Sequence, residues 1–186
     1  MKDMERSLSR TEWREAATGG LYAGLAYALL TIAAHAGRSM PGLVTILNAV
    51  SFFSFAGFLY FYARRMAAYA GGDGFSYGRR LLFVLKMSLF AGVLAGVGQF
   101  VLVNWIDPEG FREQFDLMVA NMAGGGMGEK EAEMAGSLGL KLMRNPLFAV
   151  FSGIFSMLIY GGLLGLLISI FVRRPADPFG GGTSAE

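Results

Sequence analysis

The sequence predicts an all-α integral membrane protein with four transmembrane helices and an amphipathic helical hairpin between the third and the fourth. Hydrophobic residues make up 54% of the 186 residues and charged residues 16%, against about 25% charged in a soluble domain. The apolar residues are gathered in four runs of at least 20 positions, the length that a helix needs to cross a ~30 Å hydrocarbon core. These runs do not alternate as barrel strands do, and a helix satisfies its own backbone polar groups in lipid.

The four runs are separated by residues that break or start helices. The predicted spans are 17–36, 43–62, 81–106 and 147–172. Pro41-Gly42 is a turn dipeptide between the first two spans, and the glycine-rich segment 71–74 separates the second from the third. Asn145-Pro146 precedes the fourth span, with proline in the first turn, where a helix tolerates it.

Basic residues are divided unevenly between the two ends of these spans. Ten lie on the side of the termini, namely Lys2, Arg6, Arg10, Arg14, Arg64, Arg65, Arg79, Arg80, Arg173 and Arg174. Five lie on the opposite side, namely Arg38, Arg112, Lys130, Lys141 and Arg144. The positive-inside rule therefore predicts a multi-pass protein with both termini in the cytoplasm. Residues 1–16 would form a cytoplasmic juxtamembrane tail, expected to be a solvated helix, with a helix resting on anionic lipid as the alternative. Residues 173–186 would form a flexible cytoplasmic tail.

The connection 107–145 is predicted to be an external helical hairpin. Its first part carries an apolar stripe at helical spacing, made of Phe111, Phe115, Met118 and Met122. After the break at 124–126, a second stripe consists of Met134, Leu138 and Leu142. The hairpin would lie on the outer face of the bundle or in the headgroup layer. Three interpretations stay open: a lid, a docking surface, or a cover for helix ends.

Three polar side chains in the predicted spans are candidate contacts within the bundle. Lys86 either extends its ammonium to the cytoplasmic interface or contacts an anion inside the bundle. Gln99 lies deeper in the same span and is expected to hydrogen-bond to another helix, with pore lining as the alternative. His35 ends the first span and is expected to be a hydrated interfacial group, with a titrating switch as the alternative.

Small residues recur at helical spacing in three of the spans. These predicted packing positions are Gly20, Gly24, Ala28, Gly92, Gly96, Gly161 and Gly165. Such faces let helix backbones approach closely. They fit packing within one chain and packing between the copies of a homo-oligomer equally well.

The residue types restrict the chemistry. With no cysteine and a single histidine, one chain cannot assemble the commonest metal sites or nucleophile–base pairs. A net charge of +2 without clustering gives no footprint for nucleic acid. We therefore expect no cofactor, no metal and no nucleic-acid partner, and an enzyme is the least supported class. The expected partners are the lipid bilayer and either a second copy or another membrane protein.

Several short motifs occur in a characteristic order along the chain. They are Gly19-Gly20-Leu21-Tyr22-Ala23-Gly24, Gly74-Phe75-Ser76-Tyr77-Gly78, Asp107-Pro108, Gly126-Met127, Asn145-Pro146 and Arg173-Arg174. In their order and spacing the chain resembles domain-of-unknown-function family 4199, over roughly 17–174. It departs at Gly128, where a serine cap would be typical. The resemblance implies a four-span protein of the bacterial inner (cytoplasmic) membrane and no established activity.

Two functional hypotheses follow. The first is a small non-enzymatic accessory or assembly subunit, because packing faces are abundant and charge pairs within the spans are missing from the sequence pattern. The alternative is a transporter or flippase-like component for a lipid-linked or anionic solute. It would work as an oligomer and use Lys86 and Gln99 as polar contacts.

Overall fold

The computed structural model describes residues 2–70 and 76–172, with side chains from residue 8 onward, and all elements in these ranges are helical. The predicted loop 71–74 and tail 173–186 lie outside the described residues. The elements are α1 (Lys2–Ala36), α2 (Pro41–Ala70), α3 (Tyr77–Val101), the π-helical turn η1 (Leu102–Ile106), α4 (Pro108–Gly124), α5 (Glu129–Met143) and α6 (Pro146–Phe171). The predicted all-α class is therefore confirmed.

Four of the helical segments are long and apolar enough to cross a membrane. They are Leu8–Ala36, Pro41–Ala70, Tyr77–Ile106 and Pro146–Phe171. The first three contain the predicted runs and extend past them, and the fourth covers its predicted run except for the last residue, Val172. These four helices suggest a multi-pass membrane protein.

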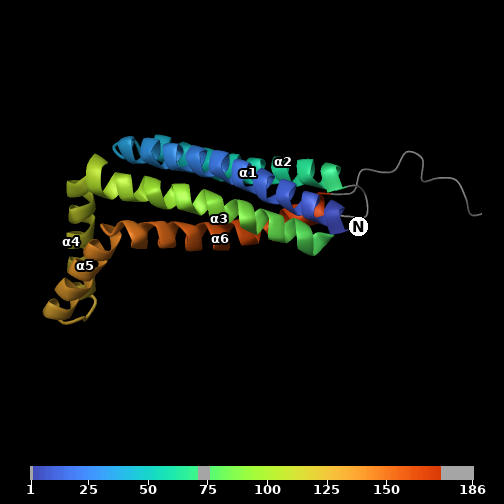
Figure 1. The fold of residues 1–186 in the computed structure, drawn as a ribbon. Coiled ribbons are helices and arrows are strands. Elements are labelled where there is room, and N and C mark those ends of the chain that lie inside the picture. The colour runs from blue at the N-terminus through green and yellow to red at the C-terminus, as the bar shows by residue number, and fades with distance from the viewer. Residues whose placement is uncertain (1, 71–75, 173–186) are drawn as a thin grey trace, which may run out of the picture.

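The four long helices run side by side, and α4 and α5 lie across one end of them (Figure 1). We call this the hairpin end, and the opposite end, where the N-terminus lies, the N-terminal end. Helix α3 is central, because it packs against α1 on one side and α6 on the other. Helix α2 packs mainly against α1.

Glycines bring α3 close to both of its neighbours. A Cβ atom on Gly24 of α1 would lie 2.7 Å from the Cα atom of Ala91, and one on Gly92 of α3 would lie 2.5 Å from the Cα atom of Ile154. The other predicted packing positions lie at the same two contacts. Gly20 faces α3, Ala28 faces Gly98 of α3, Gly96 faces α6, and Gly161 and Gly165 face α3. The small faces thus meet within one chain.

The first turns of α1 are helical, as expected, but differ from the prediction in how far they are solvated. Helix α1 is continuous from Lys2, and Glu12 and Glu15 are only 4% and 8% exposed. The expectation of solvation is wrong for these two carboxylates. They are buried because the cations on α2 and α3 described below pair with them.

The connection between α3 and α6 contains two helices that pack against each other. Gly126, with φ of +100°, allows the tight turn between them. Gly128 supplies no side-chain cap to α5, as its departure from the typical serine implies. Asn145 caps α6 by accepting hydrogen bonds from the backbone N–H groups of Leu147 and Phe148.

Candidate functional site

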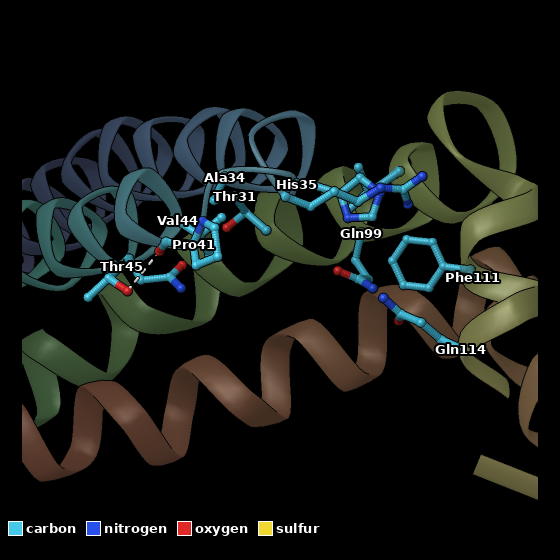
Figure 2. A pocket seen from close by; sticks show the side chains of 12 residues that line it. Thr31, Ala34, His35, Pro41, Val44, Thr45, Gln99, Phe111 and Gln114 are labelled. Atoms are coloured by element: carbon cyan, nitrogen blue, oxygen red, sulfur yellow. Dashed lines mark hydrogen bonds between the residues drawn. The ribbon is translucent and has the colours of Figure 1, made fainter. Parts of the chain in front are cut away.

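A polar groove of about 590 Å³ lies at the hairpin end, between α1, α2, α3 and α4 (Figure 2). Its lining residues are Thr31, Ala34, His35, Arg38, Pro41, Val44, Thr45, Asn48, Gln99, Leu102, Phe111 and Gln114. Two predicted candidate residues, His35 and Gln99, therefore meet at one site. Because Gln99 lies two helical turns before the end of η1, the groove reaches about 10 Å into the helical bundle.

Three side-chain amides in the groove have free hydrogen-bonding capacity. They belong to Asn48 of α2, Gln99 of α3 and Gln114 of α4. Within the described part of the chain, none of the three forms a side-chain hydrogen bond to another residue. The expectation that Gln99 bonds to another helix is thus wrong. An amide carries two donors and an acceptor, so the three groups can bind water or a polar ligand.

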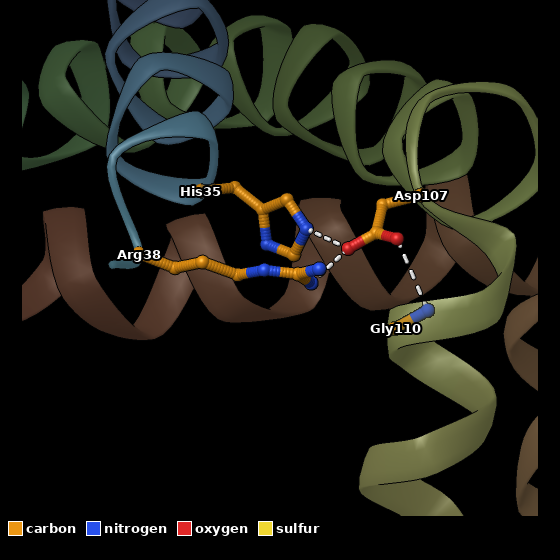
Figure 3. A network of polar contacts seen from close by, with 4 residues as sticks. All are labelled: His35, Arg38, Asp107 and Gly110. Atoms are coloured by element: carbon orange, nitrogen blue, oxygen red, sulfur yellow. Dashed lines mark hydrogen bonds and ion pairs between the residues drawn. The ribbon is translucent and has the colours of Figure 1, made fainter.

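The wall of the groove nearest the helix ends is a network centred on Asp107 (Figure 3). The Nε2 atom of His35 lies 2.7 Å from Oδ2 of Asp107, and Arg38 pairs with the same oxygen. The other carboxylate oxygen accepts a hydrogen bond of 3.0 Å from the backbone N–H of Gly110. The hydrogen bond from His35, the N–H of Gly110 and the charge of Arg38 together lower the pKa of Asp107, against the opposing effect of burial.

The π-helical turn positions Asp107. The backbone N–H of Asp107 donates to the carbonyl of Leu102, five residues earlier, at 3.0 Å. The chain then turns, and Asp107 caps the N-terminus of α4. One carboxylate thus holds the end of α1 against the start of α4. Turns of this π type occur frequently at functional sites.

An aromatic contact continues this network into the groove. The ring of His35 stacks on Phe111, with centroids 5.2 Å apart and an interplanar angle of 12°. The side chain of Arg38 is 55% exposed, and only one of its guanidinium nitrogens is engaged by Asp107. Since a guanidinium has five N–H donors, Arg38 can bind an anionic group while it remains paired.

Lys86 lies at the opposite end of the bundle. Its Nζ atom donates a hydrogen bond of 2.5 Å to Glu12 and lies 4.7 Å from the ring centroid of Trp13. Of the two arrangements expected for Lys86, this one corresponds to contact with an anionic group inside the bundle, and the anion is a carboxylate of the same chain. Nearby, Arg79 lies 3.8 Å from Glu12, and Arg65 lies 3.5 Å from Glu15.

Five residues with side chains at these two sites were not among the candidates predicted from the sequence. They are Arg38, Asn48, Asp107 and Gln114 at the groove and Glu12 at the N-terminal end. A signal for Glu12 was present. Glu12, Ala16, Gly19 and Ala23 share one side of a helix, so the packed face of the first span continues into the segment expected to be solvated.

The groove has the chemistry of a binding site. Amides and a guanidinium supply donors, which suit the acceptor oxygens of an anionic or polar ligand. Among the residues that the structure describes, no group of three or more His, Cys, Asp or Glu side chains could hold a metal ion.

Fold and site define a helical protein with four potential membrane spans and a polar groove at one end. The family model described as "Protein of unknown function (DUF4199)" matches residues 18–174. The chain belongs to this family, as the motif order indicated. No curated protein and no solved structure matches it.

Proposed function

We propose that the chain is a multi-pass protein of the bacterial inner membrane, with both termini in the cytoplasm and the groove at the opposite face. Large apolar side chains exposed along α2 and α6 support insertion in lipid, such as Phe53 at 70%, Phe151 at 68% and Phe155 at 68%. The orientation follows from the basic residues at the N-terminal end, including Arg64 and Arg65 at the end of α2.

We propose that its function is to bind an anionic solute, in particular an amphiphile such as a lipid-linked one, in the polar groove. The observation that carries this proposal is the convergence of three unpartnered amides with Arg38 at one site. Asn48 and Gln99 lie within the predicted spans, where unpaired amides are unfavourable, so a ligand that accepts their hydrogen bonds is stabilised there.

The groove is accessible from the side of the bundle. Helices α2 and α6 meet where the ring of Tyr160 lies 5.7 Å from the rings of Phe52 and Phe55. Asn48 lies one turn beyond this contact, toward the hairpin end, and is exposed. Since α6 contributes none of the lining residues, an amphiphile can place its polar group in the groove and its chains in the bilayer.

The packing of the helices favours binding over transport as the proposed activity. On the side of the groove nearer the N-terminal end, the space between the helices is filled by fully buried residues such as Phe55, Leu59 and Met87. Transport would require these helices to move apart. Binding is therefore the activity to measure first.

The binding test uses the full chain in lipid nanodiscs that contain phosphatidylglycerol and phosphatidylcholine. Retained lipid is counted by native mass spectrometry after transfer to mild detergent. Gln99→Leu removes a groove amide without removing any hydrogen bond between described residues, and Arg38→Gln removes the cation. We expect each change to lower phosphatidylglycerol retention about tenfold, the effect of one hydrogen bond of about 1.4 kcal/mol.

Matched controls change the same residue types outside the groove. Asn121 and Arg112 are exposed residues of α4 that do not line this groove. The variants Asn121→Leu and Arg112→Gln should therefore retain as much lipid as the unmodified chain. Equal retention by Gln99→Leu and Asn121→Leu would reject the binding proposal.

The proposed orientation has its own test. Because the sequence contains no cysteine, single cysteines can be introduced without removing others. In intact cells, Ser137→Cys in α5 should react with a membrane-impermeant maleimide, and Ser9→Cys in α1 should react only after lysis. The reverse pattern would invert the proposed topology.

The accessory or assembly role remains a separate prediction. It requires a specific partner, so a tagged chain extracted in mild detergent should co-purify with one protein in constant ratio. Recovery of the chain alone, together with lipid retention that depends on Gln99, would favour binding over assembly.

A further inference from the structure

The α4–α5 hairpin has three distinct sides. The two helices contact each other through aromatic and aliphatic side chains of α4 and small residues of α5. A Cβ atom on Gly139 would lie 2.8 Å from Cε1 of Phe115, and Gly136 faces Val119 in the same way. Ala132, on this side of α5, is fully buried. This contact side fixes how each helix is rotated about its axis.

One of the two remaining sides is polar. A second groove, of about 320 Å³, runs along the hairpin beside the contact side. Besides Phe115, Val119, Gly136 and Leu140, it is lined by Arg112 and Asp116 of α4 and by Glu133 and Ser137 of α5. Because both helices contribute charged or hydroxyl groups to it, this side of the hairpin is suited to water.

The opposite side of α4 faces the spans. Gln114 lines the first groove, of about 590 Å³, between the spans and α4. Arg112 instead lines the second groove, between α4 and α5. Each residue of a helix is rotated by about 100° about the axis, so residues 112 and 114 differ by about 200° and point to nearly opposite sides of α4. Met118 lies one turn after Gln114, on the side of the spans, and is 45% exposed.

The side of α5 that faces the same way is apolar. Met134, Leu138 and Leu142 recur every four residues, away from both Ala132 on the contact side and Ser137 on the polar side. Their exposed fractions are 63%, 53% and 46%. In a pair of antiparallel helices that share one polar groove, the remaining sides point in a common direction. For this hairpin it is the direction of the spans.

This apolar side continues into the surface of α6. Only three residues separate Leu142 from Pro146, the first residue of α6. The apolar side chains that follow are strongly exposed, with Leu147 at 69% and Phe151 at 68%. The hairpin extends sideways past the start of α6 (Figure 1), so its apolar side overhangs the region that surrounds the spans.

We propose that the α4–α5 hairpin is an interfacial membrane anchor. Met118, Met134, Leu138 and Leu142 lie at the boundary of headgroups and acyl chains, in the leaflet at the hairpin end. The polar groove of the hairpin faces water, the arrangement of an amphipathic helix lying in the plane of a membrane. The occupant of the apolar side is phospholipid. This inference rests on the proposed insertion of the four spans and is independent of ligand binding.

The test measures the depth of nitroxide labels on single cysteines in the full chain, reconstituted in phosphatidylcholine and phosphatidylglycerol liposomes. Leu138→Cys reports the apolar side, and its neighbour Ser137→Cys is the matched control on the polar side. Phe155→Cys, at an exposed position in the middle of α6, reports insertion. Collisions with oxygen, which concentrates in lipid, are compared with collisions with a water-soluble nickel complex.

The label at 138 should have a severalfold higher ratio of oxygen to nickel accessibility than the label at 137, and the label at 155 should have the highest ratio. Equal ratios at 137 and 138, with oxygen access at 155, would reject the anchor and leave insertion intact. Low access of both reagents at 138 would also reject it, because that result indicates burial against protein. Nickel access at 155 would overturn the proposed insertion, and the anchor with it.

Discussion

Lys86 donates a hydrogen bond of 2.5 Å to Glu12, 74 positions earlier in the chain. The side chains are 17% and 5% exposed, so water solvates neither charge well. The ring of Trp13 lies beside the ammonium, with its centroid 4.7 Å from Nζ. Removing one member of such a pair leaves the other charge buried without compensation, which destabilises far more than the pair itself stabilises. The pair therefore fixes the position of α1 along α3.

The first prediction concerns this pair. Glu12→Gln and Lys86→Met should each lower the free energy of unfolding by about 3 kcal/mol, at the lower end of values for buried pairs because Lys86 lies near the helix end. The double variant should lose clearly less than the sum of the two. Unfolding by SDS in mixed micelles measures all three, with Glu113→Gln on the exposed surface of α4 as the control. Additive losses would mean that the two residues do not interact.

A second prediction concerns the contact of α3 with α6. A Cβ atom on Gly153 would lie 2.5 Å from the backbone nitrogen of Gly96 and 2.6 Å from the carbonyl oxygen of Gly92. Backbone atoms cannot rotate away, so Gly153→Ala should force the helices apart and lower stability by about 1–3 kcal/mol. Gly57→Ala is the matched control, because no atom lies within 4 Å of its added methyl group, and it should lose nothing. Equal stability of the two variants would contradict the close packing.

The long helices and the start of α6 could be predicted because their signals are local. Four apolar runs and the dipeptide Asn145-Pro146 suffice for the four long helices and the start of α6. The predicted helix ends are less accurate where a helix continues beyond its apolar residues. Helix α2 extends to Ala70, eight residues past the predicted end of its span, because Arg64 and Arg65 are compatible with a helix at the membrane boundary.

The site could be predicted only in part. His35 and Gln99 stood out as polar residues in apolar runs, but their partners depend on how the helices are placed along and around one another. His35 meets Asp107 72 positions later, and no periodicity within one helix contains that information. Gln99 remains without a partner because the π-helical turn and α4 leave a groove beside it. A sequence pattern does not encode that space.

A third prediction concerns Gly110, which lies against the Asp107 network. A Cβ atom there would lie 2.8 Å from Cγ of Asp107 and would also meet the guanidinium of Arg38. Gly110→Ala should therefore displace the carboxylate and weaken the attachment of α4 to α1. We expect a lower midpoint of thermal unfolding by circular dichroism and faster amide hydrogen exchange in α4. Gly124→Ala, in the same helix with open space around it, should change neither; if both variants behave alike, Gly110 does not support the network.

The last prediction concerns the pH dependence that Asp107 contributes. Its pKa is lowered below the ordinary value of 3.8 by the hydrogen bond from His35, then by Gly110, and by the charge of Arg38. A carboxyl whose pKa is lower in the folded state stabilises the fold above its unfolded pKa, and this contribution is lost as the pH falls through the folded value. Asp107→Asn should therefore be less stable than the unmodified chain at pH values above 3.8. The difference should shrink as the pH is lowered below 3.8.

Thermal unfolding of both proteins across this pH range measures the difference directly. Asp116→Asn, at an exposed position of the same helix, controls for the loss of one negative charge. If the difference in stability between Asp107→Asn and the unmodified chain stays the same down to about pH 3, ionised Asp107 is not what holds α1 to α4.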